Sequence, residues 1–449
     1  MSRLSRVLSK GLLLFLCCHA SLPALALDFR QAYDRALRHD PTWLAAQSES
    51  AAGRHESALG RAALLPNLSY RYSRAHNDSK VRQSTALGDS SQELDYTSYS
   101  SSFTLSQPLF DAAAYAQYRE GQALAEAAGL SRERARQALA VRVLQAYTDV
   151  LYAEDEVALA EAHLRALREE TRRSQRFVAS GEGTLTDQLE IEAQSQIIQA
   201  RLIEAQDRRQ VARNELRTLV GRLPEGGELT PLRSTSLVLD EEVVPELDRW
   251  REWTLAHNPE LAAERYRLEA ARQRLDQQRA GHLPTVRLFA RSQISDSNTE
   301  TQVGQRYDTD SVGIEIEVPL YAGGRVLAAS RQADDTLDQA RHELDATTAE
   351  LLNDVERQYR LFQSSQRRIR AFRDAVAAAD ARLKATRRSI IGGERTNLDA
   401  LNAEQQRFEA QRDLARARYD YLLAWLSLRW HAGVLNDGDI DRVAAGFRG

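Results

Sequence analysis

The residues most capable of acid-base, nucleophilic or metal chemistry form no cluster in this 449-residue sequence. The nine histidines are scattered, and none has the spacing of a metal site such as His-Glu-x-x-His. Both cysteines, Cys17 and Cys18, lie near the amino terminus in a segment that we expect to be removed. The sequence therefore predicts no catalytic residue, no metal site and no cofactor, and we do not expect an enzyme.

Charged residues with a definite spacing occur at two glycine-bearing turns and in one predicted strand. Asp187 and Asp399 each follow a glycine-bearing turn, and Arg395 lies within the second turn. An acid near a helix start favours the helix dipole whatever its function, so a structural role stays open for both aspartates. Glu315 and Glu317 alternate with apolar residues, as in a strand with one wet face. That face could line a lumen or meet bulk water.

The first 26 residues have the features of a secretory signal peptide. Three basic residues and no acid precede an apolar run from Gly11 to Cys18, and Ala24-Leu25-Ala26 fits a signal-peptidase site. We expect cleavage after Ala26 and no lipid anchor, because Phe15 and Leu16 stand where a lipoprotein site needs a small residue before its cysteine. Loss of three basic residues changes the net charge from −4 to −7, which argues against a nucleic-acid partner.

The rest of the chain is internally duplicated. Asp40-Pro41 corresponds to Asn258-Pro259, and Leu65-Pro66 corresponds to Leu283-Pro284, with an offset of 218 residues in both cases. Each half predicts a helix, two strands, a long helix, a tip turn and a return helix. The predicted organisation is a first repeat over 27–220 (strands about 66–76 and 94–107, tip turn 180–186), a structured connector over 221–247, a second repeat over 248–431 (strands about 284–296 and 309–319, tip turn 391–397) and a tail over 432–449.

Two hairpins are predicted from a period of two in the apolar residues. The clearest strand has Val312, Ile314, Ile316 and Val318 alternating with glycine and glutamate. Phe289 breaks the alternation of its strand, because it falls among the polar positions. The polar connectors over 77–93 and 297–308 are interpreted as solvent-facing loops.

The longest predicted elements are two helices of about 65 residues, which would be about 100 Å long. From Tyr115 to Phe177 and from Val326 to Ile390 there is no proline and almost no glycine. Both contain apolar residues at coiled-coil spacing. The first seam is Val143, Ala146, Val150, Ala153, Val157, Ala160, Leu164 and Leu167.

A four-stranded sheet with one apolar face cannot enter a bilayer alone, since its edge N–H and C=O groups would be unpaired in hydrocarbon. Closure with two or three copies would give eight or twelve strands. We therefore expect a mainly α protein with a small β part that forms an oligomeric barrel continued by a helical tube. No later stretch approaches 18 consecutive apolar residues, so no transmembrane helix is predicted.

This ordered set of motifs resembles the TolC family of outer-membrane channel-tunnels. The resemblance covers essentially the whole mature chain, and it includes Val318-Pro319-Leu320-Tyr321-Ala322-Gly323-Gly324, which is similar to the family's turn from strand into long helix. Pro319, Gly323 and Gly324 would have a structural role there. The first half departs from this pattern, because Asp111-Ala112-Ala113 stands where the glycines would be.

The resemblance implies a homotrimer with a twelve-stranded barrel in the outer membrane of a Gram-negative bacterium, in contact with lipid, and a long periplasmic coiled-coil barrel. It implies a constriction at the helical tips, with Asp399 at the first acidic position, Asn402 where a second acid often occurs, and Arg395 tied to Asp187 of the other turn. It also implies a passive exit duct for type I secretion or efflux, with a periplasmic adaptor and an inner-membrane ABC or proton-driven pump as partners. The alternative is a soluble periplasmic coiled-coil adaptor or scaffold.

Overall fold

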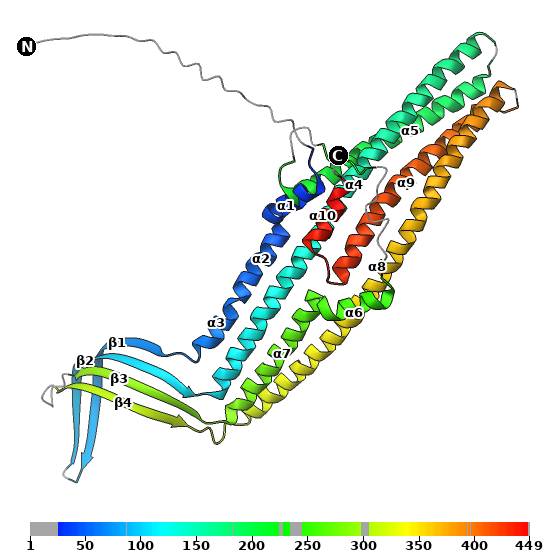
Figure 1. The fold of residues 1–449 in the computed structure, drawn as a ribbon. Coiled ribbons are helices and arrows are strands. Elements are labelled where there is room, and N and C mark those ends of the chain that lie inside the picture. Colours follow the sequence, from blue (N-terminus) through cyan, green and yellow to red (C-terminus); the bar gives the residue numbers. More distant parts are fainter. Residues whose placement is uncertain are drawn as a thin grey trace, which may run out of the picture.

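The molecule is elongated, with a β-sheet at one end and two helical hairpin tips at the other (Figure 1). The computed structural model describes residues 26–86, 88–181, 183–223, 228–233, 245–297, 305–392, 394–395 and 397–447. The predicted signal peptide up to residue 25 and the apolar part of the predicted connector, Leu237 to Leu239, lie outside the described residues. So do residues 298–304 of the loop predicted over 297–308.

The two repeats contain the same elements in the same order. The first contains α1 (Phe29–His39), α2 (Pro41–Gly53), α3 (His55–Ala62), β1 (Asn67–Thr85), β2 (Gly88–Phe110), α4 (Ala112–Ala179) and α5 (Leu185–Val220). The second contains α6 (Leu247–His257), α7 (Pro259–Arg279), a short 3-10 turn, β3 (Thr285–Ser297), β4 (Gln305–Glu317), α8 (Arg325–Ile391) and α9 (Asn397–His431). Helix α7 of the second repeat corresponds to α2 and α3 together.

The repeated Asp-Pro and Asn-Pro motifs start helices, as the sequence predicts. The Asp40 carboxylate accepts a hydrogen bond from the Trp43 backbone N–H at 3.0 Å, and the Asn258 side-chain oxygen accepts one from Glu260 at 2.8 Å. Each following proline occupies the first helical position, where a missing N–H leaves no bond unmade.

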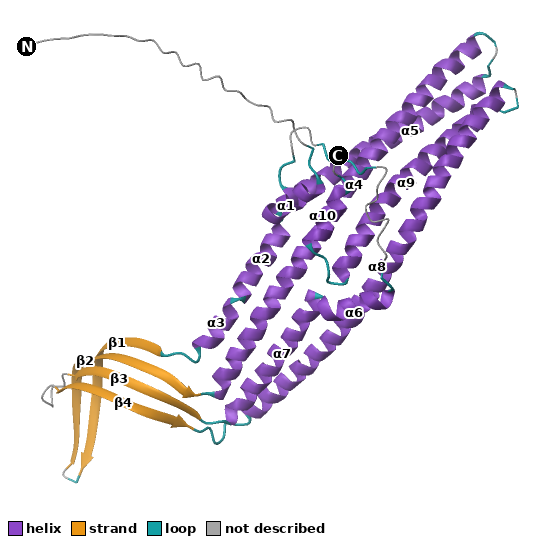
Figure 2. Cartoon of the chain, in the orientation of Figure 1, coloured by secondary structure: helices purple, strands orange, loops and turns teal. Residues whose placement is uncertain are grey.

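The four strands form one antiparallel sheet in the order β1-β2-β3-β4 (Figure 2). Strands β1 and β2 are longer than predicted, because residues 77–93, for which the sequence predicts a loop, are mostly paired strand. Among the described residues, β3 ends at Ser297 opposite Ser98, and β1 and β2 stay paired with each other beyond that point. Cross-strand pairs such as Lys80 with Glu93, at 2.5 Å, help to hold this polar extension together.

The main core lies midway along the helices, where α1, α4, α9 and the C-terminal helix α10 (Asp437–Ala445) meet. Every residue of the predicted α4 seam is buried except Ala160, which is half-buried. The buried Tyr147 hydroxyl donates to the backbone oxygens of Leu27 and Thr230, both at 2.9 Å. This contact joins the start of the expected mature chain to the connector.

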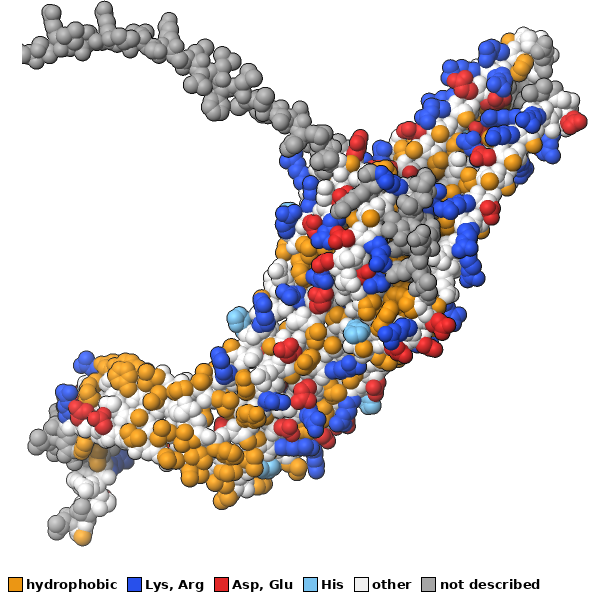
Figure 3. Space-filling model, in the orientation of Figure 1, with side chains coloured by type: hydrophobic (Ala, Val, Ile, Leu, Met, Phe, Trp, Pro, Cys, Tyr) orange, Lys and Arg blue, Asp and Glu red, His pale blue; other side chains and the backbone are white. Residues whose placement is uncertain are grey.

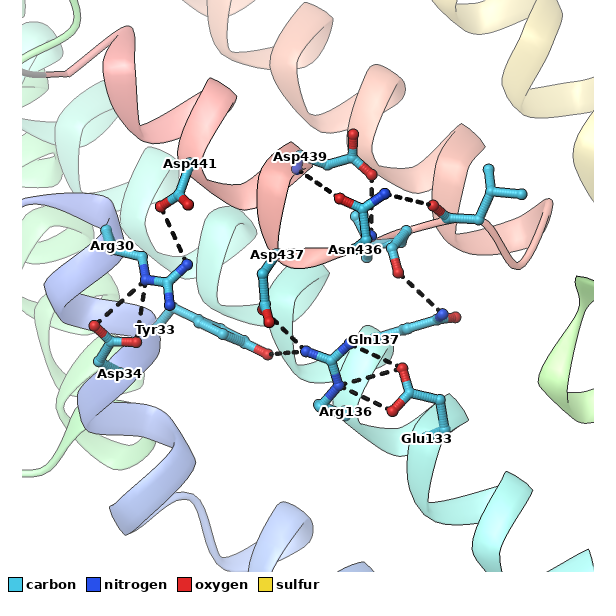
Figure 4. A network of polar contacts seen from close by, with 12 residues as sticks. Arg30, Tyr33, Asp34, Glu133, Arg136, Gln137, Asn436, Asp437, Asp439 and Asp441 are labelled. Carbon is cyan, nitrogen blue, oxygen red and sulfur yellow. Dashed lines mark hydrogen bonds and ion pairs between the residues drawn. The ribbon is translucent and has the colours of Figure 1, made fainter.

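Helix α10 belongs to the segment for which the sequence predicts only a tail. Asn436 and Asp439 form a capping box at its start. Figure 4 shows Arg136 of α4 reaching Asp437 at 3.0 Å and Arg30 of α1 reaching Asp441 at 3.1 Å. These ion pairs between separate elements hold the end of the chain against the first repeat.

Candidate functional site

Both tip turns lie at the same end of the molecule, far from the sheet (Figure 1). In the first turn, Gly181 has a φ of 81°, and the Thr184 hydroxyl accepts a hydrogen bond from the Asp187 backbone N–H at 3.1 Å. Asp187 is half-buried in the first turn of α5. The hydrogen bond to the Thr184 cap therefore fixes the position of the Asp187 backbone at the tip.

The other three predicted gate residues lie in the second turn and at the start of the helix that follows it. Arg395 is exposed between α8 and α9, and Asn402 is exposed on α9. Asp399 lies in the first turn of α9, where it is half-buried and interacts with another group. Within the described part of this single chain, no ion pair joins Arg395 to Asp187. The fold brings the two turns to one end without linking these two side chains inside one protomer.

The second tip is anchored just below these residues. Leu401 of α9 is buried in a cluster with Leu164 and Leu167 of α4 and Ile191 and Ile198 of α5. The tip of α9 is thus packed onto the α4–α5 hairpin. A shift of either hairpin would have to move this cluster.

Sequence reasoning missed a buried acid at the same tip. Glu404 is 8% exposed and lies 3.6 Å from Arg387. Burial raises the pKa of this carboxyl, while Arg387 and Arg407 lower it and Glu170 raises it further. Its spacing of three from Leu401, on the buried side of α9, is the signal that could have identified it.

A cavity of about 350 Å³ lies between α4, α5 and α9 further from the tip. His163 lines it, is 4% exposed and stacks on Phe408 with ring centroids 4.4 Å apart. Burial, with help from Arg201 and Arg407, lowers the pKa of His163 to about 4. The imidazole is therefore neutral at physiological pH.

The sheet has one apolar and one polar face, as the alternation predicts. The apolar face is open to the outside, with Val312 77% and Ile314 63% exposed. Other large side chains on this face are Leu68, Tyr70, Tyr72, Phe103, Leu105, Leu288 and Ile316. Figure 3 shows hydrophobic side chains gathered over the sheet and the adjoining turn, while charged side chains dominate the helices. Such a face is suited to lipid.

The polar face carries the predicted lumen residues. Glu315 and Glu317 both contact the guanidinium of Arg287 on the neighbouring strand, at 2.9 and 3.1 Å. All three lie on the face opposite to Val312 and Ile314. The two glutamates are therefore brought together by one arginine.

The two turns from sheet into long helix use different devices. Gly323 and Gly324 have φ values of 62° and 81°, and a β-carbon added to either would meet no atom within 4 Å, so backbone conformation rather than space requires glycine. Pro319 precedes them between β4 and α8. In the first repeat, the Asp111 carboxylate instead accepts from the Ala114 backbone N–H at 2.9 Å. A side-chain cap thus replaces the glycine pair.

Metal-binding groups and membrane-spanning helices are both lacking in the part of the chain that the structure describes. No group of three His, Cys, Asp or Glu side chains among these residues is placed to hold a metal ion. None of the described helices combines the length and the apolar character that a bilayer span requires.

A sheet with an exposed apolar face, joined to long helical hairpins, defines a class of membrane protein. In this class the sheet lies in the membrane and the helices extend from it. The family profile described as "Outer membrane efflux protein" matches residues 32–222 and 250–434. The chain belongs to this outer membrane efflux protein family, which confirms the resemblance to TolC-type channels.

Two curated relatives are similar over nearly the whole chain. "Alkaline protease secretion protein AprF" of Pseudomonas aeruginosa is 45% identical over 427 residues, covering 94% of this chain and 88% of that protein. "Proteases secretion protein PrtF" of Dickeya chrysanthemi is 39% identical, covering 95% and 92%. Among solved structures, the Vibrio cholerae outer membrane protein VceC has a TM-score of 0.75 at 22% identity, covering 90% of this chain and 96% of that one.

The protein therefore lies in the outer membrane of a Gram-negative bacterium, with its helical part in the periplasm. It is an exit duct for secretion or efflux, and the alternative of a soluble periplasmic scaffold is not supported.

Proposed function

We propose that three copies of this chain close into one channel that exports proteins by type I secretion. The observation that carries the proposal is the sheet, whose strands β1 and β4 each leave one edge unpaired within the described chain while its apolar face suits lipid. In hydrocarbon these edges must pair, and β1 of one copy can pair with β4 of the next. Three copies give twelve strands, an even number that such barrels use.

The helical part supports the same closure. Helix α4 packs on α5 and α9, and α9 packs on α8, so α5 and α8 lie toward the two sides of the protomer. Helix α5 also exposes a set of apolar side chains: Leu185, Leu189, Ile197, Ile203 and Val211. A neighbouring copy would cover these side chains in a closed tube.

The tips would form the inner constriction of that tube. Three copies of Asp399 would surround the axis and focus a negative potential, and Asn402 would add a neutral ring. We propose that Arg395 pairs with Asp187 between hairpins or between protomers and so holds the tip closed. The exposed position of Arg395 leaves it available for such a contact.

Protein cargo is favoured over drugs because the two curated relatives are named for protease secretion. The proposed partners are a periplasmic adaptor that docks on the helical tips and an inner-membrane ABC transporter that supplies the energy. A proton-driven pump is the second possibility for the energy source. The chain itself would act passively.

The cargo class can be tested by deleting the gene in its host. We expect specific polypeptides to disappear from the culture medium and to return with the intact gene, while growth inhibition by a drug panel stays unchanged throughout. Unchanged medium proteins combined with greater drug sensitivity would contradict the secretion role and favour efflux.

A further inference from the structure

The polar face of the sheet carries more positive than negative charge. Its charged side chains among the described residues are Arg71, Arg287, Arg291, Glu315 and Glu317. Arg287 pairs with both glutamates, and this group of three carries a net charge of −1. Arg71 and Arg291 are exposed, and neither guanidinium has an ion pair among the residues that the structure describes.

Strand register places these groups in successive layers. Arg287 lies opposite Glu315, Phe289 lies opposite Gly313, and Arg291 lies opposite Ser311. Arg71 comes one layer further from the helices, in line with Ser102 and Gln293. Alternate residues on one strand face are about 7 Å apart, so the two exposed arginines occupy adjacent layers beyond the ion-paired one.

Phe289 separates the paired layer from the arginines. A β-carbon on Gly313 would lie 2.8 Å from the Phe289 ring, so the ring rests on the glycine backbone of the neighbouring strand. This contact explains why an aromatic residue breaks the alternation of its strand. It also places a half-buried ring on the polar face, one layer from Arg291.

We propose that Arg71 and Arg291 form a basic belt inside the exit barrel that binds carboxylate-bearing segments of an exported polypeptide. The inference rests on the trimeric channel proposed above, in which the polar face lines the lumen and three chains contribute six exposed guanidinium groups. Arginine binds carboxylates through paired hydrogen bonds, and a ring of like charge in a narrow wet lumen concentrates anions. The ligand class is therefore an acidic peptide.

Current block in planar bilayers tests the belt directly. The purified full-length protein is inserted from detergent, and a deca-glutamate peptide is added to the barrel side, so that it reaches the belt without passing the helical tip. In low salt we expect blocking events whose mean duration falls about tenfold in the R71Q/R291Q variant. The events should also shorten in about 1 M salt, where the Debye length is about 3 Å.

The control variant is R74Q/R306Q. Arg74 and Arg306 lie in one row at the rim of the opposite face, so the control removes the same charge without touching the belt. The mean duration of its deca-glutamate block should match that of the wild type within about twofold. Deca-lysine should block both proteins for a shorter time than deca-glutamate does.

Two results would overturn the belt while leaving the channel intact. One is equal deca-glutamate block in the wild type and R71Q/R291Q, and the other is an equal loss of block in R74Q/R306Q. Membrane insertion without any current, even in the Arg395→Ala variant that should open the tip, would instead contradict the proposed channel, and with it the belt.

Discussion

The backbone of Gly433 lies so close to that of Asn258 that a β-carbon on the glycine would be 2.3 Å from the Asn258 α-carbon. Gly433 follows α9, has a φ of 74°, and meets the cap between α6 and α7. The first repeat has a similar arrangement, because Gly221, with a φ of 77°, ends α5 against the His39 ring before α2. In each repeat the return helix, α5 or α9, thus ends against the junction between the first two helices of that repeat, which are α1 and α2 or α6 and α7.

Gly433→Ala should therefore destabilise the protein strongly. The substitution combines a left-handed backbone conformation with a clash against fixed backbone, each of which costs on the order of 1–3 kcal/mol. We expect a lower thermal unfolding midpoint by far-ultraviolet circular dichroism. Gly181→Ala is the matched control, since Gly181 also has a positive φ but open space around it. Equal losses in both variants would show that close packing against Asn258 is not important.

The helical part should lose stability in acid partly through His163. Its pKa is about 4 in the folded chain because burial, Arg201 and Arg407 disfavour the charged form, against about 6.5 when unfolded. The unfolded state therefore binds the proton more tightly, so this contribution is present above about pH 6.5 and is lost as pH falls from about 6.5 to 4.

His163→Phe should reduce that loss. Phenylalanine keeps the ring stacked on Phe408 but cannot take a proton. The variant should lose on the order of 2–3 kcal/mol less stability than the wild type between about pH 7 and pH 4.5, as measured by denaturant unfolding. His431, whose pKa burial also lowers to about 4, remains and preserves part of the acid sensitivity. An unchanged pH dependence would contradict the assignment.

Opening of the tip should follow from loss of either proposed lock residue. Arg395→Ala and Asp187→Ala should each raise single-channel conductance, and the double variant should add little, because both changes break one contact. Lys384→Ala is the control, since it removes an exposed positive charge on α8 away from the turn. Wild-type conductance in both single variants would exclude these residues as the lock.

Anchoring of the second tip should depend on Leu401. Leu401→Ala removes a buried side chain from the cluster that joins α9 to α4 and α5, which typically costs about 2–5 kcal/mol when the cavity does not collapse. Because the cluster is local, we expect faster amide hydrogen exchange at both tips with little change near Tyr147 in the main core. Uniformly faster exchange would contradict a local anchor.

The long helices and paired strands could be predicted because their signals are local. Helix α4 continues from Ala112 to Ala179 without a proline, and β4 alternates in every residue from Val312 to Glu317. The prediction of a loop is wrong for the outer β1–β2 hairpin, since polar residues such as Lys80 and Glu93 are stabilised there by pairing across strands. Composition alone does not show such pairing.

Tertiary contacts explain the other misses. Helix α10 is short, and its ion pairs with Arg30 and Arg136 join residues 411 and 301 positions apart in sequence. Burial of Glu404 likewise depends on how α9 packs against the first hairpin. The gate assignments at Asp399 and Arg395 come from family resemblance and stay predictions.

The native mass of the protein extracted in mild detergent from purified outer membranes, with the detergent contribution subtracted, tests the trimeric channel most directly. We predict a particle of three chains, since three four-stranded sheets are needed to close twelve strands. An extracted particle of one or two chains, or absence of the protein from these membranes, would contradict the twelve-stranded barrel and every residue role assigned to its lumen.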